Sequence, residues 1–360
     1  MSGGARRPQV EDGDLTLTVN GRSIAGWTSV RVTRGVERFP SSFQIEMTDR
    51  DPGTPVNEGN SCEVRIGGDL LVTGFIDVVD RAFDERGNVV SVTGRSKSQD
   101  LIDCSAEWPT CQITSSTALA IAQKIAAPYG IKVAGVGDPG RVIPTFNFAL
   151  GETGADIIER TLRYTGKLLL DKPDGSVLIT DVGTAKAASG FTEGQNIQSA
   201  RITSRVDQRY SVYKIFMVAM DAFEDVGDGG NLIKTVNDPN VRPQRLKYFV
   251  AESGDSSFEV AKKRILWEAA RRKGRGQTVR IVTDRWRDKA GKLWEPNTLA
   301  PVKIPAVKLA SAELLIAEVT YRRDAERGTT AELTLMAPDA FRPAPIILQP
   351  AVNLTEVKRN

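Results

Sequence analysis

The chain has 360 residues, of which 40% are hydrophobic, and 48 Lys and Arg residues against 45 Asp and Glu residues leave a net charge of +3. This length gives room for two or three domains with real cores, and the small charge lacks the dense basic excess of proteins that bind a phosphate backbone. Because the chain has no histidine, Ser-His-Asp catalysis, Cys-His catalysis and histidine-containing zinc sites are excluded.

The first 105 residues carry short strand patterns separated by turn signals. In the segment FQIEM, Phe43, Ile45 and Met47 alternate with polar residues, which is the period of a strand with one buried face. Further strands are predicted at 15–19, 30–33, 62–66, 70–78 and 89–93. The turns between them carry NG, DPG, GG and ERGN. These features predict a small antiparallel barrel or sandwich.

The periodicity then changes from strands to helices and back. A helix is predicted at 116–127, and a second one begins after Thr153, whose side chain can cap it with Asp156 three residues later. Strands at 167–170 and 176–180 follow, joined by the turn sequence KPDG. The stretch 106–190 is therefore predicted to be a small α/β domain.

The chain also repeats itself. Residues 31–47 match residues 201–217 at six identical positions, and residues 77–93 match 318–334 at six more, in the same order along the chain. The second copy, 191–342, would hold an insertion at about 221–292. We therefore predict a mainly β (α+β) fold in which two duplicated small antiparallel β-barrels, 1–105 and 191–342, flank the α/β domain. Residues 343–360 form a proline-rich tail that we expect to be extended.

The insertion supplies the candidate contact residues. Its first part, 221–240, is rich in Gly, Asp and Asn and predicts a long loop. A helix is predicted at 258–273, with Ala261, Ile265 and Ala269 facing inward. Arg264, Trp267 and Arg271 occupy the opposite face, and a Trp between two Arg residues is typical of an interface hot spot. The alternative is a Trp that lies flat on its own domain with cation-π contacts from its neighbours.

The tail offers a second candidate contact. Its cluster Ile346, Ile347 and Leu348 favours an arm that docks on a partner over a disordered end.

Other classes of function lack support. No apolar run reaches the roughly 20 residues that span a bilayer, and the N-terminus lacks the apolar core of a signal peptide. We therefore expect folding in the cytoplasm, no membrane insertion, and three reduced structural cysteines, Cys62, Cys104 and Cys111. The chain has no GxGxxG opening a helix and no GxxxxGK[ST], so no nucleotide cofactor is predicted. We expect no catalytic residues and no metal.

Four segments together resemble the baseplate hub family of contractile phage tails. They are LVTGFIDVVDRAF, VTGRSKSQDLIDCSA, WRDKAGKLWEPNTLAPVKIP and LLIAEVTYRRDAERGTTAELTLMAPDAF. The similarity is greatest to the hubs of Mu-like phages and extends from about residue 14 to 342, with the hub part of the type VI secretion spike as a more distant relative. The shared features are glycines, strands and turns, with no catalytic signature among them.

The resemblance implies a structural protein of the virion tail baseplate that is assembled in the cytoplasm of the host bacterium. Three chains with two barrels each would form a pseudo-sixfold ring. The implied partners are other copies of the chain as a homotrimer, the tail tube or its initiator protein, the central spike, the baseplate wedge proteins and the tape-measure protein, with DNA only in transit through the central channel. The channel lining is expected not to be strongly basic, because phosphate-binding side chains would arrest DNA.

Two alternatives stay open at this stage. Small barrels often bind oligosaccharide or single-stranded nucleic acid, which predicts clustered exposed aromatic side chains on the strands. Aromatic residues make up only 6% of the chain, which argues against this binding module. A cell-wall hydrolase fused to a hub would need a separate domain with a carboxylate pair, and the predicted domains leave no segment for one.

Overall fold

The computed structural model describes residues 15–48, 56–85, 87–218, 231–250 and 258–343. The first barrel contains seven strands: β1 (Leu15–Val19), β2 (Arg22–Ile24), β3 (Ser29–Gly35), β4 (Ser42–Thr48), β5 (Ser61–Ile66), β6 (Asp69–Asp84) and β7 (Gly87–Ser96). All neighbours are antiparallel, in the order β3-β4-β7-β6-β5-β1-β2. Every strand predicted in this part of the sequence is confirmed.

Local sequence accounts for the tight connections of this barrel. Asn20 and Gly21 join β1 to β2 with φ angles of 49° and 76°, the left-handed conformation that an NG hairpin turn requires. In β4 the predicted alternation places Phe43 and Ile45 in the core, with 2% and 0% of their surface exposed. The period-two pattern therefore decides which face of each strand is buried.

The α/β domain follows the first barrel. Its elements are η1 (Lys97–Gln99), α1 (Asp100–Asp103), β8 (Gln112–Ser116), α2 (Ala118–Ala126), η2 (Ala127–Tyr129), β9 (Val133–Gly135), β10 (Ile143–Asn147), α3 (Gly154–Leu162), β11 (Leu168–Asp171) and β12 (Val177–Thr180). β8 pairs with β10, and β12 lies between β11 and β9. The Thr153 cap is confirmed, because its hydroxyl accepts a hydrogen bond from the Asp156 N–H at 3.2 Å. α2 begins two residues later than predicted, because Ser116 ends β8 and Thr117 caps the helix.

The second barrel consists of β13 (Phe191–Thr192), β14 (Ser199–Ser204), β18 (Gln277–Thr283), β19 (Leu299–Ile304), β20 (Leu309–Asp324) and β21 (Gly328–Met336), with the short helices η3 (Pro305–Val307) and η4 (Pro338–Ala340). Its order, β14-β18-β21-β20-β19, repeats the order β3-β4-β7-β6-β5 of the first barrel. One row of paired residues makes the correspondence explicit: Val30, Ile45, Val92 and Val79 in the first barrel, and Ala200, Ile281, Leu333 and Val319 in the second.

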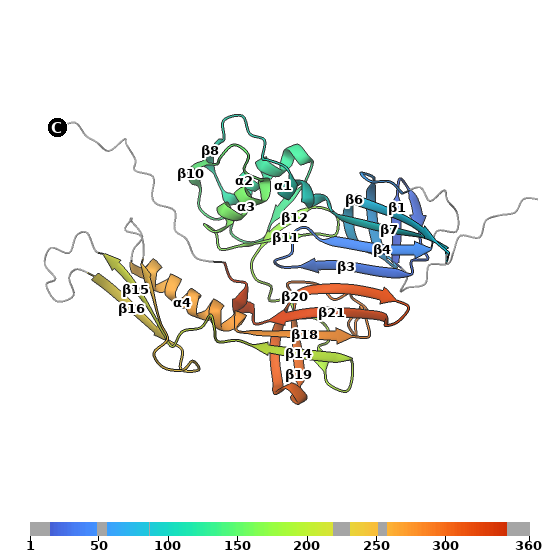
Figure 1. Ribbon diagram of the computed structural model, residues 1–360. Coiled ribbons are helices and arrows are strands. Elements are labelled where there is room, and N and C mark those ends of the chain that lie inside the picture. The colour runs from blue at the N-terminus through green and yellow to red at the C-terminus, as the bar shows by residue number, and fades with distance from the viewer. Residues whose placement is uncertain (1–14, 49–55, 86, 219–230, 251–257, 344–360) are drawn as a thin grey trace, which may run out of the picture.

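The structure corrects the predicted position of the insertion. It lies between β14 and β18, at 205–276, rather than at about 221–292. It contains β15 (Val212–Val218), β16 (Asn231–Asn237), β17 (Leu246–Val250) and α4 (Phe258–Arg275), and the three strands form a separate sheet beside the barrel (Figure 1). β15, which matches β4 in sequence, is therefore not the barrel strand equivalent to β4. That strand is β18, because it pairs with β14 and β21.

Two further details of the sequence prediction are wrong. Residues 231–237 lie in the predicted loop 221–240 but form β16, consistent with their β-branched Ile233, Thr235 and Val236. The match of 77–85 to 318–326 is one residue out of register, since Val79 corresponds to Val319. The cause is the hairpin turn, because Asp84 pairs with Gly87 whereas Asp324 pairs with Gly328, which leaves one more residue in the second turn.

The two barrels are joined directly by backbone pairing. β3 pairs with β20 in antiparallel register from Glu318 opposite Gly35 to Arg323 opposite Val30, so both barrels belong to one 13-stranded sheet. Figure 1 shows β3 beside β20 in the middle of the molecule. Thr33 and Thr320 face each other at this junction, 2% and 4% exposed, with their hydroxyl oxygens 3.0 Å apart. A single hydrophobic cluster includes residues from both barrels, so the pair folds around a shared core.

Close approach of β6 and β7 leaves no room for a side chain at one glycine of β6. A Cβ on Gly74 would lie 1.9 Å from the carbonyl oxygen of Arg95, whereas a Cβ on Gly68 would meet nothing within 4 Å. We expect Gly74→Ala to lower the free energy of unfolding by about 1–3 kcal/mol through forced displacement of β7. Gly68→Ala is the control and should change it by less than about 0.5 kcal/mol. Urea denaturation of the two variants measures the difference, and equal stability would contradict it.

Candidate assembly surfaces

The predicted contact residues of α4 do not share one environment. Ala261 and Ile265 are 3% and 1% exposed, which confirms the predicted inward stripe, and they pack on Tyr213 and Ile215 of β15. Arg264, on the other side of the helix, is exposed. Trp267 is half-buried, so the predicted polar face of α4 is only partly open to solvent.

Trp267 and Arg271 contact the C-terminal end of the described chain. The indole N–H of Trp267 donates to the carbonyl oxygen of Arg342 at 2.6 Å, and the Arg271 guanidinium donates to the same oxygen at 2.9 Å. The guanidinium carbon of Arg271 also lies 5.6 Å from the centre of the Trp267 ring. The intramolecular cation-π contact that the sequence left as an alternative is therefore present.

These two side chains also line a cavity of about 530 Å³ between α4, the barrel junction and the α/β domain. The opposite wall includes Ile102, Leu162 and Leu169. Glu159 contributes a carboxyl group, whose pKa is raised by burial and by the nearby Asp156. Trp267 and Arg271 therefore face a cleft inside the chain, while Arg264 faces outward.

Glu37 fixes the end of α4 to the first barrel. Its carboxylate forms ion pairs with Arg271, at 3.5 Å, and with Arg275. Because Glu37 follows β3, these pairs connect the helix of the insertion to the strand that joins the two barrels. The second predicted contact, Ile346, Ile347 and Leu348, lies outside the described residues.

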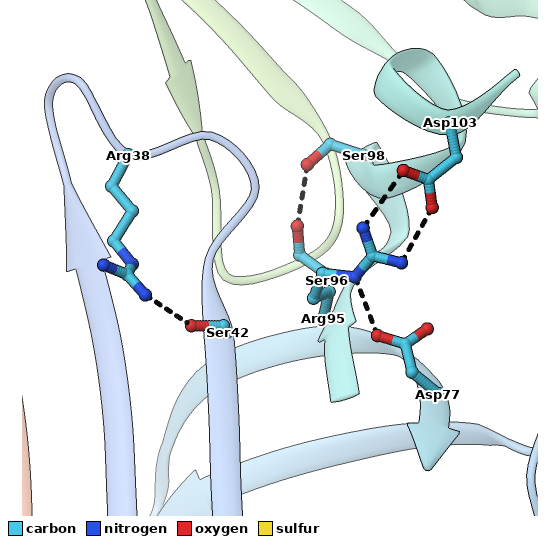
Figure 2. Close-up of polar contacts among 7 residues, drawn as sticks. All are labelled: Arg38, Ser42, Asp77, Arg95, Ser96, Ser98 and Asp103. Carbon is cyan, nitrogen blue, oxygen red and sulfur yellow. Dashed lines mark hydrogen bonds and ion pairs between the residues drawn. The ribbon is translucent and has the colours of Figure 1, made fainter. Parts of the chain in front are cut away.

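A buried carboxylate fixes the α/β domain to the first barrel. Asp171, at the end of β11, is 8% exposed and accepts hydrogen bonds from the Ser96 and Ser98 hydroxyls, both at 2.8 Å, and from the Ser41 N–H at 3.2 Å. The two hydroxyl oxygens lie 2.7 Å apart. Figure 2 shows Ser96 and Ser98 joined by this contact. A single side chain of the domain thus satisfies donors from two separate segments of the barrel.

An arginine pairs with two carboxylates at the same junction. Arg95, near the end of β7, lies 2.7 Å from Asp77 of β6 and 2.7 Å from Asp103 of α1 (Figure 2). The hydrogen bond to Asp103, and after it the one to Asp77, raise the pKa of Arg95. Both bonds therefore stabilise the charged form of its guanidinium group. The sequence analysis missed both Asp171 and Arg95, and the only signal was the polar run RSKSQD, which contains Arg95, Ser96 and Ser98.

Metal-binding clusters, membrane-spanning helices and clusters of exposed aromatic side chains would each indicate another class of function in the described residues. These residues hold no group of three or more His, Cys, Asp or Glu side chains placed to bind a metal. None of their helices is both long and apolar enough to cross a membrane. Among their exposed large hydrophobic side chains the aromatic ones are Phe83 on β6 and Tyr248 on β17, in different parts of the fold. They do not form the aromatic cluster that a barrel-type binding module predicts.

Three family models match separate parts of the chain. The model described as Mu phage baseplate assembly protein GpP-like, N-terminal, matches residues 14–96. The second domain of the baseplate hub protein gp44-like family matches 98–181, and the fourth domain of Mu phage baseplate assembly protein GpP matches 257–344. The three matched segments coincide with the first barrel, with the α/β domain and with the stretch from α4 to η4, respectively.

Two individual proteins that are similar to this chain carry matching descriptions. Baseplate hub protein gp44 of Escherichia phage Mu is 28% identical over 342 residues, which cover 91% of this chain and 88% of that protein. The crystal structure of the 43 kDa tail protein of prophage MuSo2 from Shewanella oneidensis is 30% identical, with a TM-score of 0.81 over 92% of this chain and 100% of that one.

A more distant likeness concerns the fold alone. An E. coli component of the type VI secretion system is 11% identical, with a TM-score of 0.55 over 93% of this chain and 80% of that one.

The contribution of Arg95 to the junction between the first barrel and the α/β domain can be measured by comparing its loss with the loss of an ion pair within one strand. Arg95→Gln removes the contacts with both Asp77 and Asp103, and we expect it to lower the free energy of unfolding by about 1–2 kcal/mol. Arg65→Gln is the matched control, because Arg65 pairs with Glu63 on its own strand β5, at 2.9 Å, and connects no domains. Its loss should be below about 0.5 kcal/mol in the same urea denaturation series. Equal losses would show that Arg95 does not fix the junction.

Proposed function

The chain belongs to the family of Mu-like phage baseplate hub proteins, and from this premise we propose that three copies form the hub ring of a contractile tail. The ring would connect the sixfold tail tube to the threefold central spike. Its centre would be the channel through which the tape-measure protein and then DNA pass. The ring would be a component of the virion baseplate, assembled in the cytoplasm of the host.

The junction of β3 with β20 carries this proposal. It joins two barrels of the same strand order side by side in one sheet. Three such chains would present six similar barrels, which can match a sixfold tube on one face, while the three α/β domains and insertions keep threefold symmetry. Closed threefold symmetry requires only one kind of heterologous contact, repeated three times.

The mechanism we propose is assembly without covalent chemistry. The family is one of structural baseplate proteins, and binding energy alone is enough to fix the order in which spike, hub, wedges and tube join. Passage of DNA requires that the channel wall holds no dense array of Lys and Arg side chains, since phosphate contacts would arrest it. A strongly basic channel wall would contradict this part of the proposal.

We further propose that the outer face of α4 contacts a neighbouring baseplate protein. Arg264 is exposed and lies one turn before the half-buried Trp267, so this face combines a charge with partly open aromatic surface. Trp267 and Arg271 would support the contact from behind, because their bonds to Arg342 fix the orientation of the helix. Ile346, Ile347 and Leu348 are proposed as a second contact, made by the tail.

Oligomeric mass tests the proposed ring. We expect light scattering of the purified protein, over a concentration series at two salt concentrations, to give three times the mass of one chain. The mass should change little with salt if apolar contacts hold the chains together, because such contacts are screened far less than surface ion pairs. A stable dimer or tetramer would contradict the threefold ring, and co-expression with the spike protein would show whether the trimer copurifies with it.

The contact proposed for α4 can be tested by reversing one charge. We expect Arg264→Glu to weaken copurification of the hub with co-expressed tube or wedge proteins by about tenfold, the effect of a hot-spot arginine. Lys263→Glu makes the same charge change on an exposed neighbour about 100° around the helix and serves as control. Equal retention of partners by both variants would exclude Arg264 from the interface.

A further inference from the structure

Arginine side chains from two parts of the chain meet at the C-terminal end of α4. Arg271, Arg272 and Arg275 lie in the last turns of this helix, where the negative end of the helix dipole favours cations. The segment that follows β14 supplies Arg205 and Arg209. These arginines line one cavity of about 400 Å³, a volume within the range of ligand pockets.

The rest of the cavity wall is polar as well. Among the described residues it consists of Asp207, Gln208, Glu268 and Gly276, so no hydrophobic side chain of the described chain lines it. Two side-chain carboxylates therefore face a larger number of guanidinium groups. A wall of this kind favours a hydrated, negatively charged ligand over an apolar one.

The chain's own carboxylates neutralise two of these arginines. Arg209 lies 2.6 Å from Asp238, and Arg272 lies 2.8 Å from Glu268, so each has a carboxylate of its own. The other acid of the wall, Asp207, is exposed and forms no ion pair within the described part of the chain. Three arginines of the wall are therefore left to be balanced by other groups.

These three arginines are incompletely neutralised. Arg271 and Arg275 share one carboxylate, that of Glu37, which lies 3.5 Å from Arg271. Burial, and after it the charge of Arg275, lowers the pKa of Arg271, so the two guanidinium groups still repel each other. Arg205 is exposed and forms no ion pair with any described residue. An anion in the cavity would relieve the repulsion and would pair with Arg205.

Positive charge continues beside the cavity. The guanidinium carbon of Arg245 lies 5.2 Å from the centre of the Tyr210 ring, and the ammonium nitrogen of Lys247 lies 5.8 Å from it. Arg245 also donates hydrogen bonds to the backbone carbonyl oxygens of Asp207, at 2.7 Å, and Arg209, at 2.9 Å. Two further cations are therefore held next to the site, where they would attract an acidic partner before contact.

We propose that this arginine-lined cavity binds an acidic segment of a neighbouring protein, whose Asp or Glu carboxylates pair with Arg205, Arg271 and Arg275. An arginine that already donates to one carboxylate keeps further N–H donors in its planar fork, so the existing ion pairs need not break. This inference deepens the proposed function, on which it rests for the presence of protein partners. It adds the chemistry by which one such partner is recognised.

An acidic segment fits the cavity better than a single phosphate ion does. A cavity of about 400 Å³ is much larger than one phosphate ion, which would reach only part of the wall. Several carboxylates spaced along a segment can each meet a different guanidinium group. The resulting charge-assisted hydrogen bonds are stronger than neutral ones.

Binding of a defined acidic peptide tests the site. Fluorescence anisotropy measures the affinity of the full chain for a labelled hexaglutamate peptide and for hexaglutamine, its uncharged counterpart, at two salt concentrations. We expect hexaglutamate to bind about tenfold more tightly and to lose affinity at the higher salt concentration, because the contacts are ionic. Equal affinity for the two peptides would overturn the proposal.

A charge reversal locates the binding on the chain. Arg205→Glu should weaken hexaglutamate binding about tenfold, because it sets like charges against each other. Arg141→Glu is the matched control, since it makes the same change of net charge at an exposed arginine of the α/β domain, and it should bind the peptide as the unchanged chain does. Equal weakening by both variants would show an effect of net charge alone and would count against the site.

Protection from chemical modification gives a readout on the unchanged chain, which the misfolding of a variant cannot affect. Phenylglyoxal modifies accessible arginines, and mass spectrometry identifies the modified positions. Hexaglutamate should reduce the modification of Arg205 several-fold and leave that of Arg141 unchanged. Equal modification of Arg205 with and without the peptide would exclude it from the contact.

Competing ligands and the oligomeric mass separate the remaining outcomes. Inorganic phosphate or a DNA duplex that binds as tightly as hexaglutamate, with the same dependence on Arg205, would assign the site to phosphate groups and overturn the acidic segment. A chain that is trimeric by light scattering but does not bind hexaglutamate would overturn this site and leave the proposed ring standing. A monomeric chain that binds the peptide through Arg205 would support the site and contradict the stable ring.

Discussion

The arrangement of this protein depends on one antiparallel contact, the pairing of β3 with β20. These strands come from opposite ends of the sequence, and their pairing fuses two barrels into one sheet with a shared core. Glu37, which follows β3, anchors α4 through Arg271 and Arg275. The direction of β3 thus sets both the second barrel and the helix of the insertion relative to the first barrel.

The α/β domain is held to this frame by polar contacts. Asp171 is buried and accepts hydrogen bonds from Ser41 and Ser96 of the first barrel and from Ser98 of η1, and Arg95 connects two carboxylates across the same boundary. Buried hydrogen bonds and ion pairs of this kind stabilise only one geometry, because a partner that shifts leaves a buried polar group unpaired. They suit a domain that must keep one orientation relative to the barrels in the ring proposed above.

Sequence and structure agree best where the signal is local. The strands of the first barrel, the NG turn, the Thr153 cap and the apolar stripe of α4 follow from side-chain period and turn chemistry within a few residues. The sequence repeat correctly indicated two related barrels. It failed at β15, because an alternating strand pattern states which face is buried but carries no information about which strand lies alongside.

The sequence by itself thus determined the predicted strands of the first barrel, helices α2, α3 and α4, the two related barrels and the family, since each rests on local patterns or on motifs that persist along the chain. Tertiary structure alone decided where the insertion begins, that Trp267 and Arg271 turn toward Arg342, and that Asp171 and Arg95 close the domain junction. The physical reason is that these features join residues that are tens to hundreds of positions apart. Such contacts depend on the register and direction of whole strands, which neighbouring residues do not encode.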